Sequence, residues 1–158
     1  MNAIDRKKHA KKTFESVLAM LDGIQLHYTA EEEDLSVHLK MTGDDFTLNV
    51  FIVMDEDREL VRFFVRPPFD FPEERRILGA KAAADINNRL IVGTFHYTYE
   101  KGGLLFEDAL VYGDTILSKE VLERAFRLAV HTVDDNIETF FGLAKGLIDY
   151  EEFLARID

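Results

Sequence analysis

Regular alternation of apolar and polar side chains between residues 35 and 66 is the feature that most constrains the fold of this chain. Apolar positions recur at every second residue in three runs, 35–41, 46–54 and 59–66, which short polar segments separate. A strand with one buried face shows this period of two, and consecutive strands joined by short turns pair antiparallel. The sequence therefore predicts an antiparallel meander, which a shorter strand at 26–29 joins.

Helical periodicity flanks the predicted meander. Apolar residues recur at three- and four-residue spacing in segments 5–22, 72–90, 118–141 and 147–157. A second hairpin, 92–99 with 104–112, turns at Gly102-Gly103, because adjacent glycines tolerate the positive φ of a tight turn. We expect an α+β fold, with an antiparallel sheet and helices in the order α-βββ-α-ββ-α, followed by a C-terminal helix.

Composition narrows the classes of function. The 158 residues suit one domain with a single core, and the absence of cysteine excludes thiolate sites and favours the reducing cytoplasm. No apolar run approaches the roughly 20 residues that span a bilayer. The net charge of −11 disfavours nucleic acid and anionic membranes as partners. Residues 1–12 are locally basic, which we interpret as a solvated helical turn, with docking on an acidic partner or sister subunit as the alternative.

Several short motifs resemble the YbjN family. They are Ala84-Asp85-Ile86-Asn87-Asn88-Arg89-Leu90, Gly93-Thr94-Phe95 with the turn at Gly102-Gly103, and the helix start Ser118-Lys119-Glu120-Val121-Leu122. YbjN proteins are bacterial and often labelled regulators of sensory transduction. Their fold resembles that of type III secretion chaperones, small acidic dimers that hold segments of client proteins. The resemblance implies one domain over residues 1–158, with a shared core at about 13–141 and an extra helix in 142–158. It carries no catalytic residue over to this chain.

Two sets of polar residues are weighed as metal ligands. The first set, which shares one face of the third helix, is His131, Asp134, Asp135 and Glu138. That face lies opposite the apolar stripe, so we expect it to be solvated. The second set, on three predicted strands, is His27, His38 and His96. Scattered histidines are more often surface residues, and no phosphate loop, G-x-S-x-G or H-E-x-x-H motif occurs. We expect no metal, no cofactor and no enzymatic activity.

Apolar side chains on the second face of the predicted sheet indicate binding. They are Phe51, Val53, Leu60 and Phe64, and the loop beyond the prolines adds Phe69 and Phe71. A sheet covered by helices on one side should be polar on the other, so we expect another chain to cover these residues. Cover by the terminal helix of the same subunit, or a bulge that inverts the alternation, is the alternative. In the second helix, Ala80, Ala83 and Ala84 would let another backbone approach closely.

These features predict a non-catalytic protein-binding module, a homodimer that holds a protein client in a chaperone-like or regulatory role. The interface candidates are the six apolar residues of the second face and loop, and the three alanines of the second helix. A small-molecule or metal-responsive sensor that uses the surface histidines and carboxylates is the first alternative, and a structural subunit of a larger assembly is the second.

Overall fold

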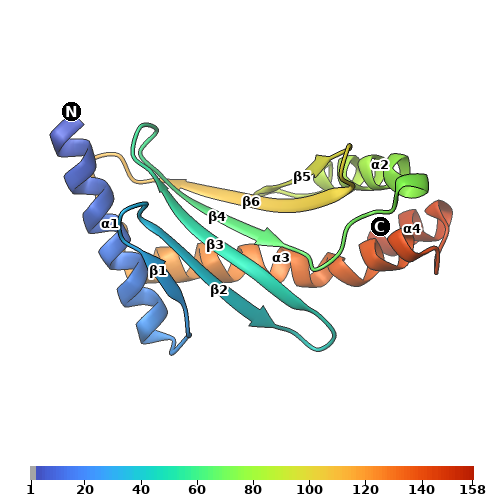
Figure 1. The fold of residues 1–158 in the computed structure, drawn as a ribbon, viewed down its shortest axis with the longest axis horizontal. Coiled ribbons are helices and arrows are strands. Elements are labelled where there is room, and N and C mark those ends of the chain that lie inside the picture. The colour runs from blue at the N-terminus through green and yellow to red at the C-terminus, as the bar shows by residue number, and fades with distance from the viewer. Residues whose placement is uncertain (1–2) are drawn as a thin grey trace.

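The computed structural model describes residues 3–158, and its elements follow the predicted order (Figure 1). They are α1 (Ala3–Gly23), β1 (Thr29–Glu31), β2 (Ser36–Thr42), β3 (Thr47–Asp55), β4 (Leu60–Arg66), the 3₁₀ turn η1 (Glu73–Arg75), α2 (Arg76–Asn87), β5 (Thr94–Thr98), β6 (Gly103–Val111), α3 (Lys119–Lys145) and α4 (Tyr150–Ile157). Within residues 3–158 the strands form one six-stranded sheet in the order β1-β2-β3-β4-β6-β5. All neighbouring strands run antiparallel. The predicted α+β class and the antiparallel meander are confirmed.

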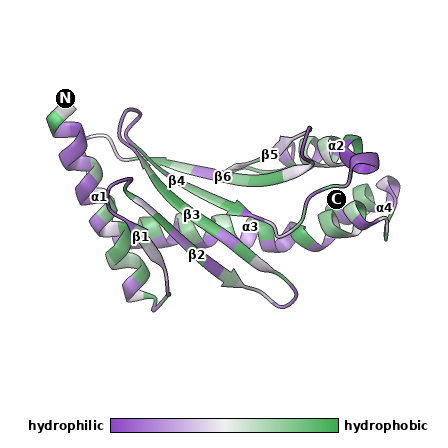
Figure 2. Ribbon diagram, in the orientation of Figure 1, coloured by the Kyte–Doolittle hydropathy of each residue, from purple (hydrophilic) through white to green (hydrophobic). Residues whose placement is uncertain are grey.

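The helix α3 covers one face of the sheet, here called the inner face. It contacts β4 and β6, while α1 contacts β3, and Figure 1 shows α3 crossing behind the strands. Val50, Ile52 and Phe63 are among the inner-face side chains that are fully buried, and Figure 2 shows hydrophobic positions recurring along the strands. The registers of β2–β3 and β3–β4 are continuous. No bulge in these described strands inverts the predicted alternation.

The helix α3 is longer than the sequence predicts. Ser118 caps its start, and the Ser118 hydroxyl accepts a hydrogen bond from the Val121 backbone N–H, as an N-cap should. Gly142 lies inside the helix, and its lack of a side chain lets the returning chain come close: an added Cβ would lie 3.3 Å from Ile148 Cγ1. It ends before Gly146, whose φ of 71° is the left-handed conformation that follows many helices.

The helix α4 packs on α2 and α3, at the far end of the molecule from α1 (Figure 1). Phe153 is fully buried there, stacked on Tyr150 and near the Phe140 ring. The terminal helix therefore does not cover Phe51 or Phe64 on the second face of the sheet. None of the helices within residues 3–158 combines the length and the apolar character needed to cross a bilayer.

The small residues of α2 allow close packing within the subunit. Gly79 faces Tyr97 of β5, and a Cβ on Gly79 would lie 2.5 Å from the Tyr97 hydroxyl oxygen. Ala83 is only 3% exposed. The prediction that these positions admit a second backbone is wrong for Ala83, because the core of the same chain buries it. Ala80 is half-buried and Ala84 is exposed.

Candidate interaction surface

The face of the sheet opposite α3, here called the outer face, carries most of the candidate residues. Alternation brings together Phe51 and Val53 from β3, Leu60 and Phe64 from β4, and Leu105 from β6. Phe51 is 37% exposed, and the other four are half-buried. In Figure 1, which looks onto this face, none of the described helices crosses in front of β3, β4 or β6. The outer face thus exposes apolar groups on a rigid scaffold.

Aromatic rings form the centre of the outer face. Phe51 and Phe64 are direct cross-strand partners, and the His38 ring stacks on Phe51 with centroids 4.6 Å apart and an interplanar angle of 17°. His38 Nε2 lies 3.2 Å from Asn49 Oδ1. The Arg62 guanidinium lies 4.8 Å from the Phe64 ring centroid, a cation–π geometry. These contacts hold the rings in place before binding, which lowers the entropy cost of association.

Paired charges border the aromatic centre. Arg62 Nε donates to Glu107 Oε1 at 2.6 Å, and His96 Nε2 lies 2.8 Å from Glu107 Oε2. The hydrogen bond to Glu107 raises the pKa of Arg62 above its ordinary value, against the opposing effect of burial. The Arg58 backbone N–H lowers the pKa of the Asp55 carboxyl. Charges that already have partners lose less when a second chain removes water from them.

A groove of about 540 Å³ opens at one end of the outer face. Its apolar walls are Phe51, Phe64 and Leu105. Arg66, which approaches Asp70 at 3.6 Å, and the exposed Lys101 supply its cations. The groove is open to water along its length, so it suits side chains of another polypeptide better than a reaction that needs a water-excluding site.

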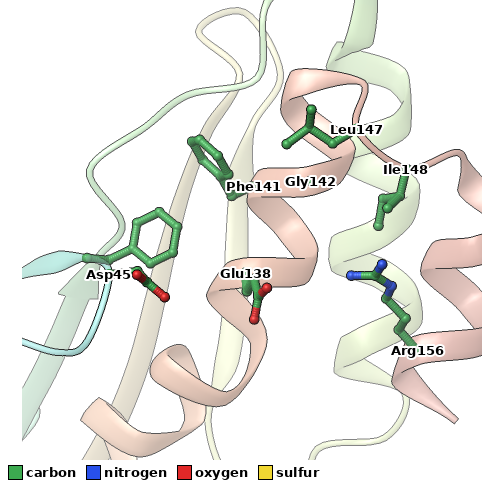
Figure 3. A pocket seen from close by; sticks show the side chains of 8 residues that line it. Asp45, Glu138, Phe141, Gly142, Leu147, Ile148 and Arg156 are labelled. Carbon is green, nitrogen blue, oxygen red and sulfur yellow. The ribbon is translucent and has the colours of Figure 1, made fainter.

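A second hollow of about 530 Å³ lies between the β2–β3 turn, α3, the α3–α4 connection and the end of α4 (Figure 3). Asp45, Glu138 and Arg156 line it together with the Phe141 ring. The Arg156 guanidinium already donates to Glu152 Oε1 at 2.7 Å. Both lining carboxylates are exposed. General acid–base catalysis by two carboxylates needs environments that separate their pKa values, and this hollow offers no such shielding.

The loop aromatics turn inward instead of joining the outer face. Phe71 is 1% exposed and packs edge-on against Tyr97 and Phe140. Its backbone N–H donates to the Gly102 carbonyl at 2.7 Å, so the β5–β6 turn holds the loop in place. The prediction of Phe71 as an interface residue is wrong, because the core buries its whole side chain. Phe69 is half-buried against the Phe141 ring.

The three histidines predicted on strands do not converge, and among them His96 alone contacts a carboxylate within residues 3–158, that of Glu107. His38 on β2 and His96 on β5 are separated by three intervening strands, or roughly 19 Å at the usual strand spacing. His27 is exposed, as are the four polar residues weighed on α3. Among the residues that the structure describes, no three His, Cys, Asp or Glu side chains lie close enough together to hold a metal ion.

Sequence reasoning missed several residues of the outer face. The alternation that assigned Leu60 and Phe64 to this face also places Arg62 between them, so the signal for Arg62 was present. Glu107 and Leu105 are different. Glu107 lies opposite Phe64, and Leu105 lines the groove with Arg66, because β6 pairs with β4. The strand pattern alone does not show which strand lies beside β4.

The family model of YbjN, described as "Putative bacterial sensory transduction regulator", matches residues 13–142. The chain belongs to the YbjN family. The region of the YbjN match contains every strand of the sheet and hence the whole outer face, whereas α4 lies beyond it. No curated protein sequence matches the chain significantly.

Solved structures place this YbjN-family chain in the secretion-chaperone-like fold. It is similar to YbjN from E. coli, described as "a putative transcription regulator", with a TM-score of 0.57 and 10% identity over 76% of this chain and 84% of that one. A chain of the HopA1–SchA chaperone–effector complex gives a TM-score of 0.50 and 12% identity, over 85% and 95%. A chain of the ExsC–ExsE complex gives 0.47 and 11%, over 77% and 88%. At such identities the likeness concerns the fold.

Proposed function

We propose that this YbjN-family protein is a non-catalytic binding module, a cytoplasmic homodimer that holds a protein partner in a chaperone-like or regulatory role. The observation that supports it is the outer face: the exposed Phe51 and the half-buried Phe64 and Leu105 share a sheet face that none of the described helices covers (Figure 1), beside the paired charges of Arg62 and Glu107. The surface by which the protein associates with other polypeptide chains is this face.

The chemistry of the outer face matches that of protein interfaces. Aromatic residues and arginine are enriched at such interfaces and provide most of their energetic hot spots. Phe51, Phe64 and Arg62 supply this combination within one contiguous area. Removal of apolar surface from water is favourable by about 25 cal/mol per Å². The likeness in fold to a chain of a chaperone–effector complex agrees with a polypeptide partner.

No specific observation favours the sensor alternative. The histidines that it would use lie far apart on the sheet or are exposed on their own, within residues 3–158. The hollow of Figure 3 is open and lined by exposed charges.

Site-specific photo-crosslinking tests the proposal. A benzophenone amino acid replaces Phe64 on the outer face, and in a control protein it replaces Leu128, which is 43% exposed on α3. Irradiation in the source cells should trap a polypeptide at position 64, either a second copy or another protein, and not at position 128. Failure to trap any polypeptide at 64, or equal trapping at both positions, would overturn the proposed function.

A further inference from the structure

The groove on the outer face carries an excess of positive charge on a strongly acidic chain. Arg66 and Lys101 line it, against one lining carboxylate within residues 3–158, that of Asp70, whereas the whole chain has a net charge of −11. Lys40 adds a third exposed cation nearby, because Lys40 and Arg66 both pair with Asn49 of β3. The charge of this groove is therefore opposite in sign to that of the chain.

The cations of the groove keep most of their bonding capacity. Arg66 Nη2 lies 3.6 Å from Asp70 Oδ1, which is beyond hydrogen-bonding distance, and the two side chains are 56% and 49% exposed. The guanidinium therefore still has its N–H donors to offer. Among the residues that the structure describes, neither Lys40 nor Lys101 has a carboxylate partner.

The carboxylate nearest the aromatic centre is, in contrast, already paired. Glu107 holds Arg62 at 2.6 Å and His96 at 2.8 Å. Glu31 is exposed, but it lies on the edge strand β1, and β2 separates that strand from β3, where the groove begins. The unpaired charges that border the groove are thus mainly cations.

Other hollows of the chain have the reverse balance of charge. The hollow of Figure 3 is lined by the carboxylates of Asp45 and Glu138 against the single cation Arg156. A hollow of about 360 Å³ beside α1 has Lys7 and Lys11 in its lining. Four carboxylates outnumber them there, those of Glu15, Glu32, Glu33 and Glu56. An excess of cations beside aromatic walls therefore distinguishes the outer-face groove from both of these hollows.

We propose that the groove binds an extended segment of another protein in which a carboxylate lies within two residues of an apolar side chain. The proposal rests on the proposed function, because it gives the chemistry of the polypeptide that the outer face holds. The apolar side chain packs against Phe51 and Phe64, and the carboxylate reaches Arg66 and Lys101. A basic segment would place like charges together at the same point, which costs binding energy.

The spacing of the groove residues sets the spacing within the bound segment. Phe64 and Arg66 are two residues apart on β4, and both side chains lie on the outer face. A strand rises about 3.3 Å per residue, so these two positions lie roughly 6.6 Å apart. An extended ligand has the same rise, and two of its residues span the same distance. A guanidinium also matches the planar, two-oxygen geometry of a carboxylate.

Selection from a displayed library of random twelve-residue peptides on the full-length protein tests the proposal. Sequencing of the selected pool should show aspartate or glutamate enriched within two residues of leucine, isoleucine, valine or phenylalanine, relative to the unselected library. The same selection on the variant Arg66→Glu with Lys101→Glu should lose this enrichment. Lys101→Glu alone serves as a milder variant in case the double substitution disturbs the loop.

Fluorescence anisotropy with one selected peptide, made synthetically, gives the dissociation constants. The double variant should bind this peptide at least about tenfold more weakly than the wild type. Binding to the wild type should also weaken as sodium chloride rises from about 0.05 to 0.5 M, because salt screens exposed charges. Thermal unfolding of each variant checks that it is folded.

The matched control is Lys8→Glu with Lys12→Glu on α1. It makes the same change of charge at exposed positions in the other cationic region of the chain. Its affinity for the selected peptide should stay close to that of the wild type. An equal or larger loss in this control would place the peptide on α1 and overturn the inference.

Two further results would also overturn the inference. One is a selected pool that is basic or shows no preference for carboxylates. The other is a pool without any enriched peptide. If a polypeptide is still trapped by the crosslinker at position 64, including a second copy of this chain, the proposed function stands without the inference. If nothing is trapped there either, both are overturned.

Discussion

At the scale of single residues, Asp108 is a carboxylate on the buried, helix-covered face of the sheet. It lies on the inner face opposite Phe63 and is 8% exposed. Burial raises the pKa of Asp108, the hydrogen bond from the Ala109 N–H opposes this, and the charge of Glu107 adds to it. A raised folded pKa means that protonation stabilises the folded state. That stability is complete below the unfolded pKa and is lost as pH rises through the folded value.

We therefore expect Asp108→Asn to have a free energy of unfolding about 1 kcal/mol higher than that of the wild type at pH 7.5. The reason is that the amide keeps the shape of the side chain without the buried charge. The difference should narrow as pH falls toward the unfolded pKa of about 3.9. Urea unfolding at several pH values measures it. The exposed Asp135→Asn should show little difference at any pH. A less stable Asp108→Asn, or a gap that does not change with pH, would contradict the assignment.

At the scale of elements, α2 protects the edge strand β5. The Asn87 side chain, at the end of α2, donates from Nδ2 to the Phe95 carbonyl at 2.9 Å and accepts at Oδ1 from the Phe95 N–H at 2.7 Å. It therefore takes the place of a neighbouring strand at this position. An edge strand otherwise presents unpaired backbone groups that invite another chain.

Asn87→Asp should destabilise the protein by about 1–3 kcal/mol, because a carboxylate cannot donate to the Phe95 carbonyl and leaves it unpaired. Hydrogen exchange of the Phe95 amide and thermal unfolding provide the two measurements. Asn88→Asp adds the same charge one residue later, where the side chain is exposed, and should cost much less. Equal losses in both variants would show that charge at the helix end, and not the hydrogen-bond pair, is responsible.

The elements also show what local sequence can and cannot predict. Alternation assigned Phe51 and Phe64 correctly to the outer face, since a period of two needs no knowledge of distant residues. The same rule could not place Glu107 beside Phe64, because a helix and a strand lie between β4 and β6 in the sequence. The sequence predicts Phe71 at the surface, whereas its side chain is buried. Alternation gives no rule for a loop, and the path of this loop depends on tertiary contacts such as the backbone hydrogen bond from Phe71 to Gly102.

At the scale of the whole molecule, α4 is part of the core although it lies beyond the region that matches the YbjN family. The Phe153 side chain is fully buried, with its ring against those of Phe140 of α3 and Tyr150. Phe153→Ala should lower the free energy of unfolding by about 3–5 kcal/mol in one cooperative transition. Urea unfolding followed by circular dichroism checks this, with the exposed Glu151→Ala as control. A loss below 1 kcal/mol, or a separate early transition, would indicate that α4 is only loosely attached.

The two edge strands of the sheet, β1 and β5, limit how many copies of the chain could associate by strand addition. Fibre growth by strand addition needs a receptive border on both sides of every copy, so that each newcomer offers a fresh template to the next. Here Asn87 occupies the β5 border at Phe95, and the other border is a strand of only three residues. Even where two copies met along the β1 border, neither would retain a second site, and propagation would stop at the pair.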